Sequence, residues 1–71
     1  MYRVTCAAFA CPIDKVFYTD DAITVDKFIF HTMWERGYKL KNYRLLKDCV
    51  EYCFTNPYNE LLYIYRFKEK P

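Results

Sequence analysis

Four cysteines are the residues best suited to chemistry, because a thiolate can bind a metal ion, form a disulfide or act as a nucleophile. They form two loose pairs, Cys6 with Cys11 and Cys49 with Cys53, and His31 is the only histidine. Structural zinc sites hold such pairs in tight turns. The segment between Cys49 and Cys53 instead has a strand-like composition, which would set the two thiols about 13 Å apart, four residues at ~3.3 Å each. Since one ion cannot bridge that distance, we interpret the four as small buried thiols and predict no metal and no cofactor.

Other catalytic arrangements are also missing from the sequence. His31 falls on the polar side of a predicted helix, near Lys27 and Glu35, and therefore away from the thiols. Gly37 is the only glycine, which excludes a glycine-rich phosphate loop. A chain of 71 residues provides for one domain with one pair of packed layers. We therefore expect a single domain over residues 1–71 without enzymatic activity.

A β-hairpin near the C-terminus is the clearest structural signal. Two aromatic and β-branched runs flank residues 56–59, where Pro57 suits the first central position of a type I turn and Asn59 tolerates a left-handed conformation. This turn sets Asn56 opposite Glu60 and fixes which side chains share a face. One face is predicted to join the core and holds Val50, Tyr52, Phe54, Leu62 and Ile64. The other presents Leu61, Tyr63, Tyr65 and Phe67 opposite Cys49, Glu51, Cys53 and Thr55.

A helix is predicted in the middle of the chain. Asp21 or Thr24 can cap it, Asp26 then lies in the first turn, and Gly37 ends it in a left-handed conformation. Its apolar stripe would lie on a sheet and consists of Val25, Phe28, Ile29, Thr32 and Met33. Phe30 and Trp34 fall outside this stripe, so we expect them to form an aromatic ridge turned away from the sheet.

The remaining segments predict strands. Period-two alternation indicates one over residues 2–9 and a short one over 15–19. Residues 38–47 favour a further strand, with a short helix over 42–48 as the alternative. The order is therefore β-β-α-β-β-β, or β-β-α-β-β in the alternative. This predicts a small two-layer α+β domain, an antiparallel sheet of about four to five strands with one helix on one face.

The second sheet face has no predicted element left to cover it. Tyr, Trp and Phe are enriched at the centres of protein interfaces, and aromatic residues make up 21% of this chain. We therefore predict a non-enzymatic interaction module that forms a homodimer or docks on another protein; an inhibitor-type accessory protein of a phage or other mobile element would fit this size. The predicted partner-binding residues are Leu61, Tyr63, Tyr65 and Phe67 on the sheet and Phe30 and Trp34 on the helix.

A single-stranded nucleic-acid-binding domain is the alternative function. Basic and aromatic residues interleave in one segment, and an open sheet could use them to neutralise phosphates and stack bases. The residues concerned are Lys39, Lys41, Tyr43 and Arg44. The formal net charge of +2 is too small to favour such a partner by itself.

The first residues of the chain lack the apolar core and cleavage site of a secretory signal. No apolar run approaches the ~20 residues of a membrane span. We therefore expect a cytoplasmic protein with reduced thiols and no membrane partner.

Overall fold

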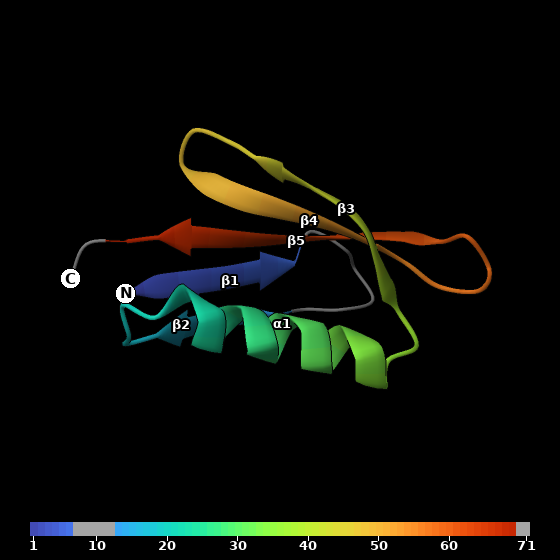
Figure 1. Ribbon diagram of the computed structural model, residues 1–71, viewed down its shortest axis with the longest axis horizontal. Coiled ribbons are helices and arrows are strands. Elements are labelled where there is room, and N and C mark those ends of the chain that lie inside the picture. Colours follow the sequence, from blue (N-terminus) through green and yellow to red (C-terminus); the bar gives the residue numbers. More distant parts are fainter. Residues whose placement is uncertain (7–12, 70–71) are drawn as a thin grey trace.

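The computed structural model describes residues 1–6 and 13–69. These form β1 (Tyr2–Cys6), β2 (Asp14–Phe17), α1 (Ala22–Glu35), β3 (Lys39–Leu45), β4 (Cys49–Thr55) and β5 (Leu61–Lys68). The strands make one antiparallel sheet in the order β2-β1-β5-β4-β3 (Figure 1). The predicted α+β fold and the order β-β-α-β-β-β are confirmed, and the shorter β-β-α-β-β alternative is wrong. The first strand was predicted to run through residue 9, and its last three positions lie outside the described residues.

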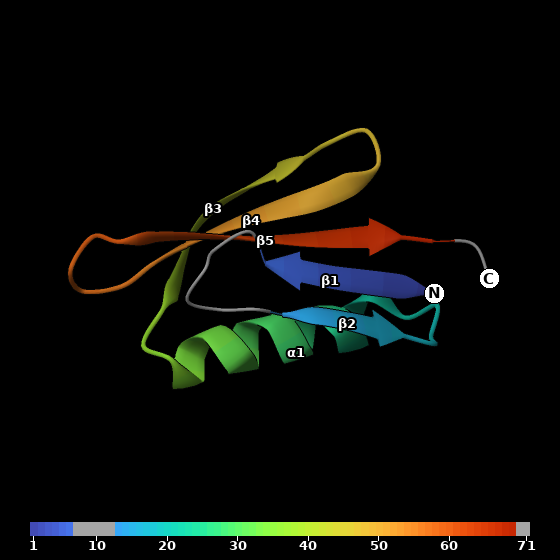
Figure 2. The ribbon, with the colours of Figure 1, turned by 180° about the vertical axis from the view of Figure 1, so that it is seen from behind.

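The helix α1 packs on part of one face of the sheet. It lies in front of β2 in Figure 1 and behind it in Figure 2, where the molecule is seen from the other side. Its buried side chains Val25, Ile29 and Met33 come from the predicted stripe. They pack on buried residues of three strands, namely Tyr2, Val4, Tyr52, Phe54, Leu62 and Ile64. Among the described residues, no helix has the length and hydropathy needed to cross a bilayer.

The ends of α1 follow from its capping residues. The carboxylate of Asp21 accepts hydrogen bonds from the Ile23 amide (3.0 Å) and the Thr24 hydroxyl (2.9 Å), and these bonds lower the pKa of Asp21. Asp21 is therefore the N-cap and Thr24 is not. Because the helix starts at Ala22, Asp26 lies in the second turn, and its predicted place in the first turn is wrong. Gly37, with φ of +82°, follows the helix as predicted.

The hairpin of β4 and β5 has the predicted register. Tyr52 lies opposite Ile64, and Phe54 lies opposite Leu62. The Asn56 amide donates to the Glu60 carbonyl at 3.2 Å, and Asn59 adopts φ of +62°. The turn residues thus separate the two faces of β5 as the sequence indicated.

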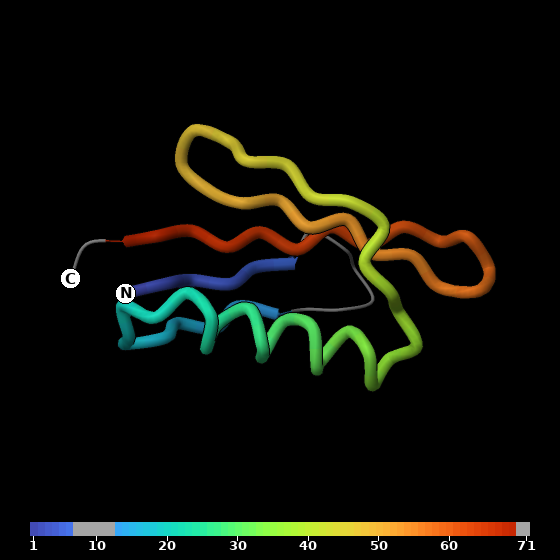
Figure 3. The backbone as a smooth tube through the Cα atoms, in the orientation of Figure 1, coloured from blue at the N-terminus to red at the C-terminus, as the bar shows by residue number. Residues whose placement is uncertain are grey.

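The segment 38–47 contains strand β3, so the alternative short helix over 42–48 is wrong. The register against β4 shifts between Leu40 and Asn42, which makes Lys41 the extra residue of a β-bulge. Beyond the bulge, Tyr43 lies opposite Tyr52 on the helix side of the sheet. Figure 3 traces the chain from the end of α1 through β3 to the β3–β4 turn, which lies on the side of the molecule away from the helix.

Candidate functional site

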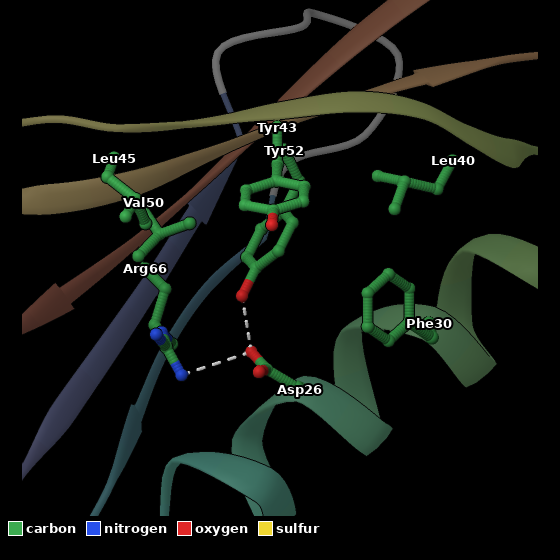
Figure 4. A pocket seen from close by; sticks show the side chains of 8 residues that line it. All are labelled: Asp26, Phe30, Leu40, Tyr43, Leu45, Val50, Tyr52 and Arg66. Atoms are coloured by element: carbon green, nitrogen blue, oxygen red, sulfur yellow. Dashed lines mark hydrogen bonds and ion pairs between the residues drawn. The ribbon is translucent and has the colours of Figure 1, made fainter.

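A groove runs between α1 and β3 on the helix side of the sheet. One cavity of about 310 Å³ is joined to a second of about 400 Å³ through two shared lining residues, Phe30 and Leu40. Figure 4 shows the first cavity, with Phe30 and Leu40 on one side and Leu45 and Val50 on the other. We call this surface the α1–β3 groove and define its apolar rim as Phe30, Trp34, Leu40, Tyr43 and Leu45.

The groove exists because the single helix does not cover the whole sheet. The buried helix residues pack on β1, β4 and β5, whereas every residue of β3 is exposed. The β-bulge at Lys41 sets Leu40, Tyr43 and Leu45 opposite Phe54, Tyr52 and Val50, so all three share the helix side of the sheet. The helix is also the only element on this side in the described part of the chain. Apolar side chains of β3 are therefore left beside the helix instead of beneath it.

Phe30 does not point away from the sheet, and that prediction is wrong. Its ring contacts Tyr52 and Phe54 edge to face, with centroids 5.6 and 5.9 Å apart. Phe30 lies three positions before the buried Met33, which at 3.6 residues per turn places it ~60° from Met33 and so at the margin of the stripe. Trp34 does project outward and stacks on the ring of His31 at 6.5 Å. One member of the expected ridge thus forms a wall of the groove.

Polar side chains meet in the first cavity, away from the junction at Phe30 and Leu40 (Figure 4). The Tyr52 hydroxyl donates to Asp26 Oδ1 at 2.6 Å, and Arg66 Nη1 lies 3.2 Å from the same oxygen. Burial, and then the bond to Asp26, raise the pKa of Tyr52, which stays a donor at neutral pH. The guanidinium of Arg66 also lies over the Tyr2 ring at 5.3 Å. These groups bind one another, so they fix α1 on the sheet rather than offer a reactive centre.

The sheet face away from α1, which we call the open face, carries the other predicted residues. Leu61, Tyr63, Tyr65 and Phe67 share it along β5. Leu61 and Tyr63 are 46% and 37% exposed, while Tyr65 and Phe67 are half-buried and stack on each other at 6.4 Å. The six predicted partner-binding residues therefore lie on two opposite surfaces, four on the open face and two on the groove.

A polar network closes part of the open face. Glu51 is buried there and accepts hydrogen bonds from Arg44 Nε and the Tyr65 hydroxyl, both at 2.8 Å. Both bonds lower the pKa of Glu51, that from Arg44 more. The bond to Glu51 in turn raises the pKa of Tyr65. The buried carboxylate of Glu51 on the open face is thus bonded by two residues of the same chain, Arg44 and Tyr65.

The residues of the nucleic-acid alternative do not form one patch. Lys39 and Arg44 lie opposite Thr55 and Glu51, on the open face. Tyr43 lies on the other side of the sheet, where it lines the groove, and Lys41 occupies the bulge. Tyr43, the residue expected to stack on bases, and Arg44 therefore point to opposite sides of the sheet. Arg44 is also paired with Glu51.

The cysteines and the histidine are separated as well. Cys53 is buried and Cys49 half-buried, both on the open-face side of β4, and burial is the main cause that raises the pKa of the Cys49 thiol. Cys11 lies outside the described residues. His31 pairs with Glu35 on the helix surface. Within residues 1–6 and 13–69, no three His, Cys, Asp or Glu side chains are grouped as metal ligands would be.

Comparisons with protein-family models, curated proteins and solved structures gave no significant match. The function is therefore inferred from the surface itself. Sequence analysis did not identify Leu40, Tyr43 and Leu45 as groove residues. In the sequence, Tyr38 and Leu40 alternate with Lys39 and Lys41 and the alternation breaks at Asn42; that break is the one sign of the bulge that brings the three residues to the same side.

Proposed function

We propose that this chain is a non-enzymatic interaction module that docks on another protein through the α1–β3 groove. One observation supports this most. All five rim residues are exposed to solvent, at 38% (Phe30), 71% (Trp34), 40% (Leu40), 59% (Tyr43) and 76% (Leu45). Contiguous exposed apolar surface of this kind marks interaction sites in soluble proteins, and Trp and Tyr are common energetic anchors there.

The expected energy of covering this rim is large enough to matter. Full burial of one large apolar side chain contributes about 1.5–3 kcal/mol, so covering the exposed part of five gives roughly 4–8 kcal/mol. Association costs about 4–15 kcal/mol in lost translational and rotational freedom, and the ordering of side chains adds to this cost. Apolar contact alone would therefore give a weak complex, and a specific partner needs further bonds at the same place.

Self-association through the open face is the second form of the proposal. Leu61 and Tyr63 are exposed beside the stacked pair Tyr65 and Phe67, and no element in the described part of the chain covers them. A symmetric dimer would bury this patch against its own copy. If the chain self-associates through the open face, Tyr65→Ala lowers its mass in solution and Trp34→Ala does not. If it instead docks on another protein through the α1–β3 groove, neither variant changes the mass, and only Trp34→Ala weakens partner binding.

A selection experiment separates the two surfaces without knowledge of the natural partner. Binders are selected from a random peptide display library on the purified chain, and each is titrated while the emission of Trp34, the only tryptophan, is followed. We expect the emission to shift to shorter wavelength as the rim is covered. Leu45→Ser should abolish binding, and Tyr63→Ser, a matched change on the open face, should leave it intact.

The reverse pattern would contradict the groove. Binders that tolerate Leu45→Ser and are lost with Tyr63→Ser would move the site to the open face. Sedimentation velocity on the same variants provides the second measurement: a dimer of the parent chain that Tyr63→Ser dissociates would show self-association instead of docking on a different protein.

A further inference from the structure

We infer that the occupant of the α1–β3 groove is an extended, acidic segment of the partner, which adds as a sixth strand to the free edge of β3. The inference rests on the proposed function and names the chemistry of its partner. Three independent features of β3 support it: the direction of its backbone groups, the position of its apolar side chains, and its charge.

The first feature is the backbone. In the described part of the sheet, β3 is the terminal strand and pairs only with β4. The Leu46 amide donates to the Cys49 carbonyl at 2.9 Å. Because alternate residues of an antiparallel strand bond to the same neighbour, Arg44 also turns its N–H and C=O groups toward β4, and Tyr43 and Leu45 turn theirs to the outer edge. An added strand would find unpaired donors and acceptors at these two residues.

The same two residues line the groove with their side chains. A strand that bonds to the outer edge of β3 would therefore place every second side chain over the groove, beside Tyr43 and Leu45. The backbone bonds supply the further energy that the apolar rim lacks. Strand addition thus uses the edge and the groove together, whereas a helix laid in the groove would leave the edge unpaired.

The third feature is charge. Residues 39–47 contain four of the eleven Lys and Arg residues and none of the nine Asp and Glu residues, so this segment carries +4 and the rest of the chain carries −2. The charges belong to Lys39, Lys41, Arg44 and Lys47. Of these, Arg44 is the one with an ion pair among the described residues, to Glu51. Acidic side chains alternating with apolar ones in the added strand would complement this edge.

A second copy of this chain does not fit the edge. Two β3 strands paired about a two-fold axis would bring their Lys and Arg residues together, and like charges on neighbouring strands are destabilising. Lysines on a sheet edge are a common defence against such self-pairing. The charge that disfavours a copy is the charge that favours an acidic partner.

Synthetic peptides test the inference directly. The probe is an acetylated and amidated peptide of about eight residues that alternates Val and Glu, and its control has Lys in place of Glu. We expect the Glu peptide to shift the amide resonances of Tyr43 and Leu45 and to slow their hydrogen exchange, and the Lys peptide to have no effect. Its affinity should fall as the salt concentration rises from about 0.05 to 0.5 M.

Two variants and two modified peptides make the test specific. Lys39→Glu combined with Lys41→Glu should weaken the Glu peptide at least about tenfold, whereas Lys27→Glu, on the helix, should not. N-methylation of one alternate set of peptide amides should abolish binding and methylation of the other set should preserve it, because only one set faces β3.

These experiments distinguish failure of the strand-addition inference from failure of the proposed function. Equal binding of the Glu and Lys peptides, or tolerance of both methylation patterns, would overturn strand addition by an acidic segment. If library-selected binders still require Leu45 and the Glu peptide does not bind, the inference falls and the proposed function stands. If those binders do not require Leu45 either, the proposed function falls with it.

Discussion

Replacement of Tyr52 by Phe tests the contact that fixes α1 on the sheet and so sets the width of the groove. The change removes the hydroxyl that donates to Asp26 at 2.6 Å and keeps the ring that packs against Phe30 at 5.6 Å. A hydrogen bond to a charged group contributes about 1.5–3 kcal/mol. Asp26 keeps its ion pair with Arg66 and is partly exposed, so we expect a loss of about 1–2 kcal/mol in the free energy of unfolding.

A thermal melt with a matched control measures this loss. For a domain of this size, 1 kcal/mol corresponds to a shift of about 4–8 °C in Tm, so Tyr52→Phe should melt roughly 4–16 °C below the parent. Tyr43→Phe removes a hydroxyl from the exposed ring directly opposite and should change the free energy of unfolding by less than about 0.5 kcal/mol. Equal melting of the parent and Tyr52→Phe would refute the role assigned to the contact between Asp26 and the sheet.

Three further predictions follow from single sites. Trp34→Ala should weaken the library-selected binders by more than about tenfold and Leu45→Ser should abolish their binding, yet both variants should keep Tm within a few degrees, because both side chains are mostly exposed; calorimetric titration with those binders and a thermal melt of the same samples measure the two effects. Arg44→Gln should reduce the pH dependence of stability. In the parent, the pKa of Glu51 is lowered by folding, so the ionised carboxylate stabilises the fold at pH values above the ordinary Glu pKa of about 4.3. This stabilisation is lost as the pH falls through the pKa that Glu51 has in the folded protein. Urea midpoints at pH 7 and pH 3 should therefore differ less in the variant, and an unchanged difference would contradict this. Asn59→Ala, at φ of +62°, should cost about 1 kcal/mol while Asn59→Gly is nearly neutral, since only the former meets the left-handed penalty; equal urea midpoints would contradict the turn assignment.

The hairpin of β4 and β5 was predictable from local chemistry. Pro57 and Asn59 restrict the backbone to one turn type, and the turn fixes the register and the facing of every residue in both strands. The helix was predictable for the same reason, since its stripe and its terminal glycine act within a few residues. Such elements depend on neighbours along the chain.

The groove was not predictable from the sequence because it depends on where the helix crosses the sheet. That position depends on contacts between residues far apart in the chain, among them the packing of Val25, Ile29 and Met33 on the sheet and the bonds of Asp26 to Tyr52 and Arg66. The bulge at Lys41 also escaped prediction, and it decides that Leu40 and Tyr43 share a side. Phe30 sits at the margin of its stripe, where a small rotation of the helix decides between solvent and sheet. Periodicity alone does not determine that rotation.

The location of the partner-binding surface can be measured most directly with leucine methyl resonances. Leu40 and Leu45 lie on the rim of the α1–β3 groove and Leu61 lies on the open face, so selective methyl labelling reports on both surfaces in one spectrum. When a library-selected binder is added, we expect the methyl resonances of Leu40 and Leu45 to shift and those of Leu61 to stay in place. A shift of Leu61 with Leu40 and Leu45 unchanged would contradict this expectation.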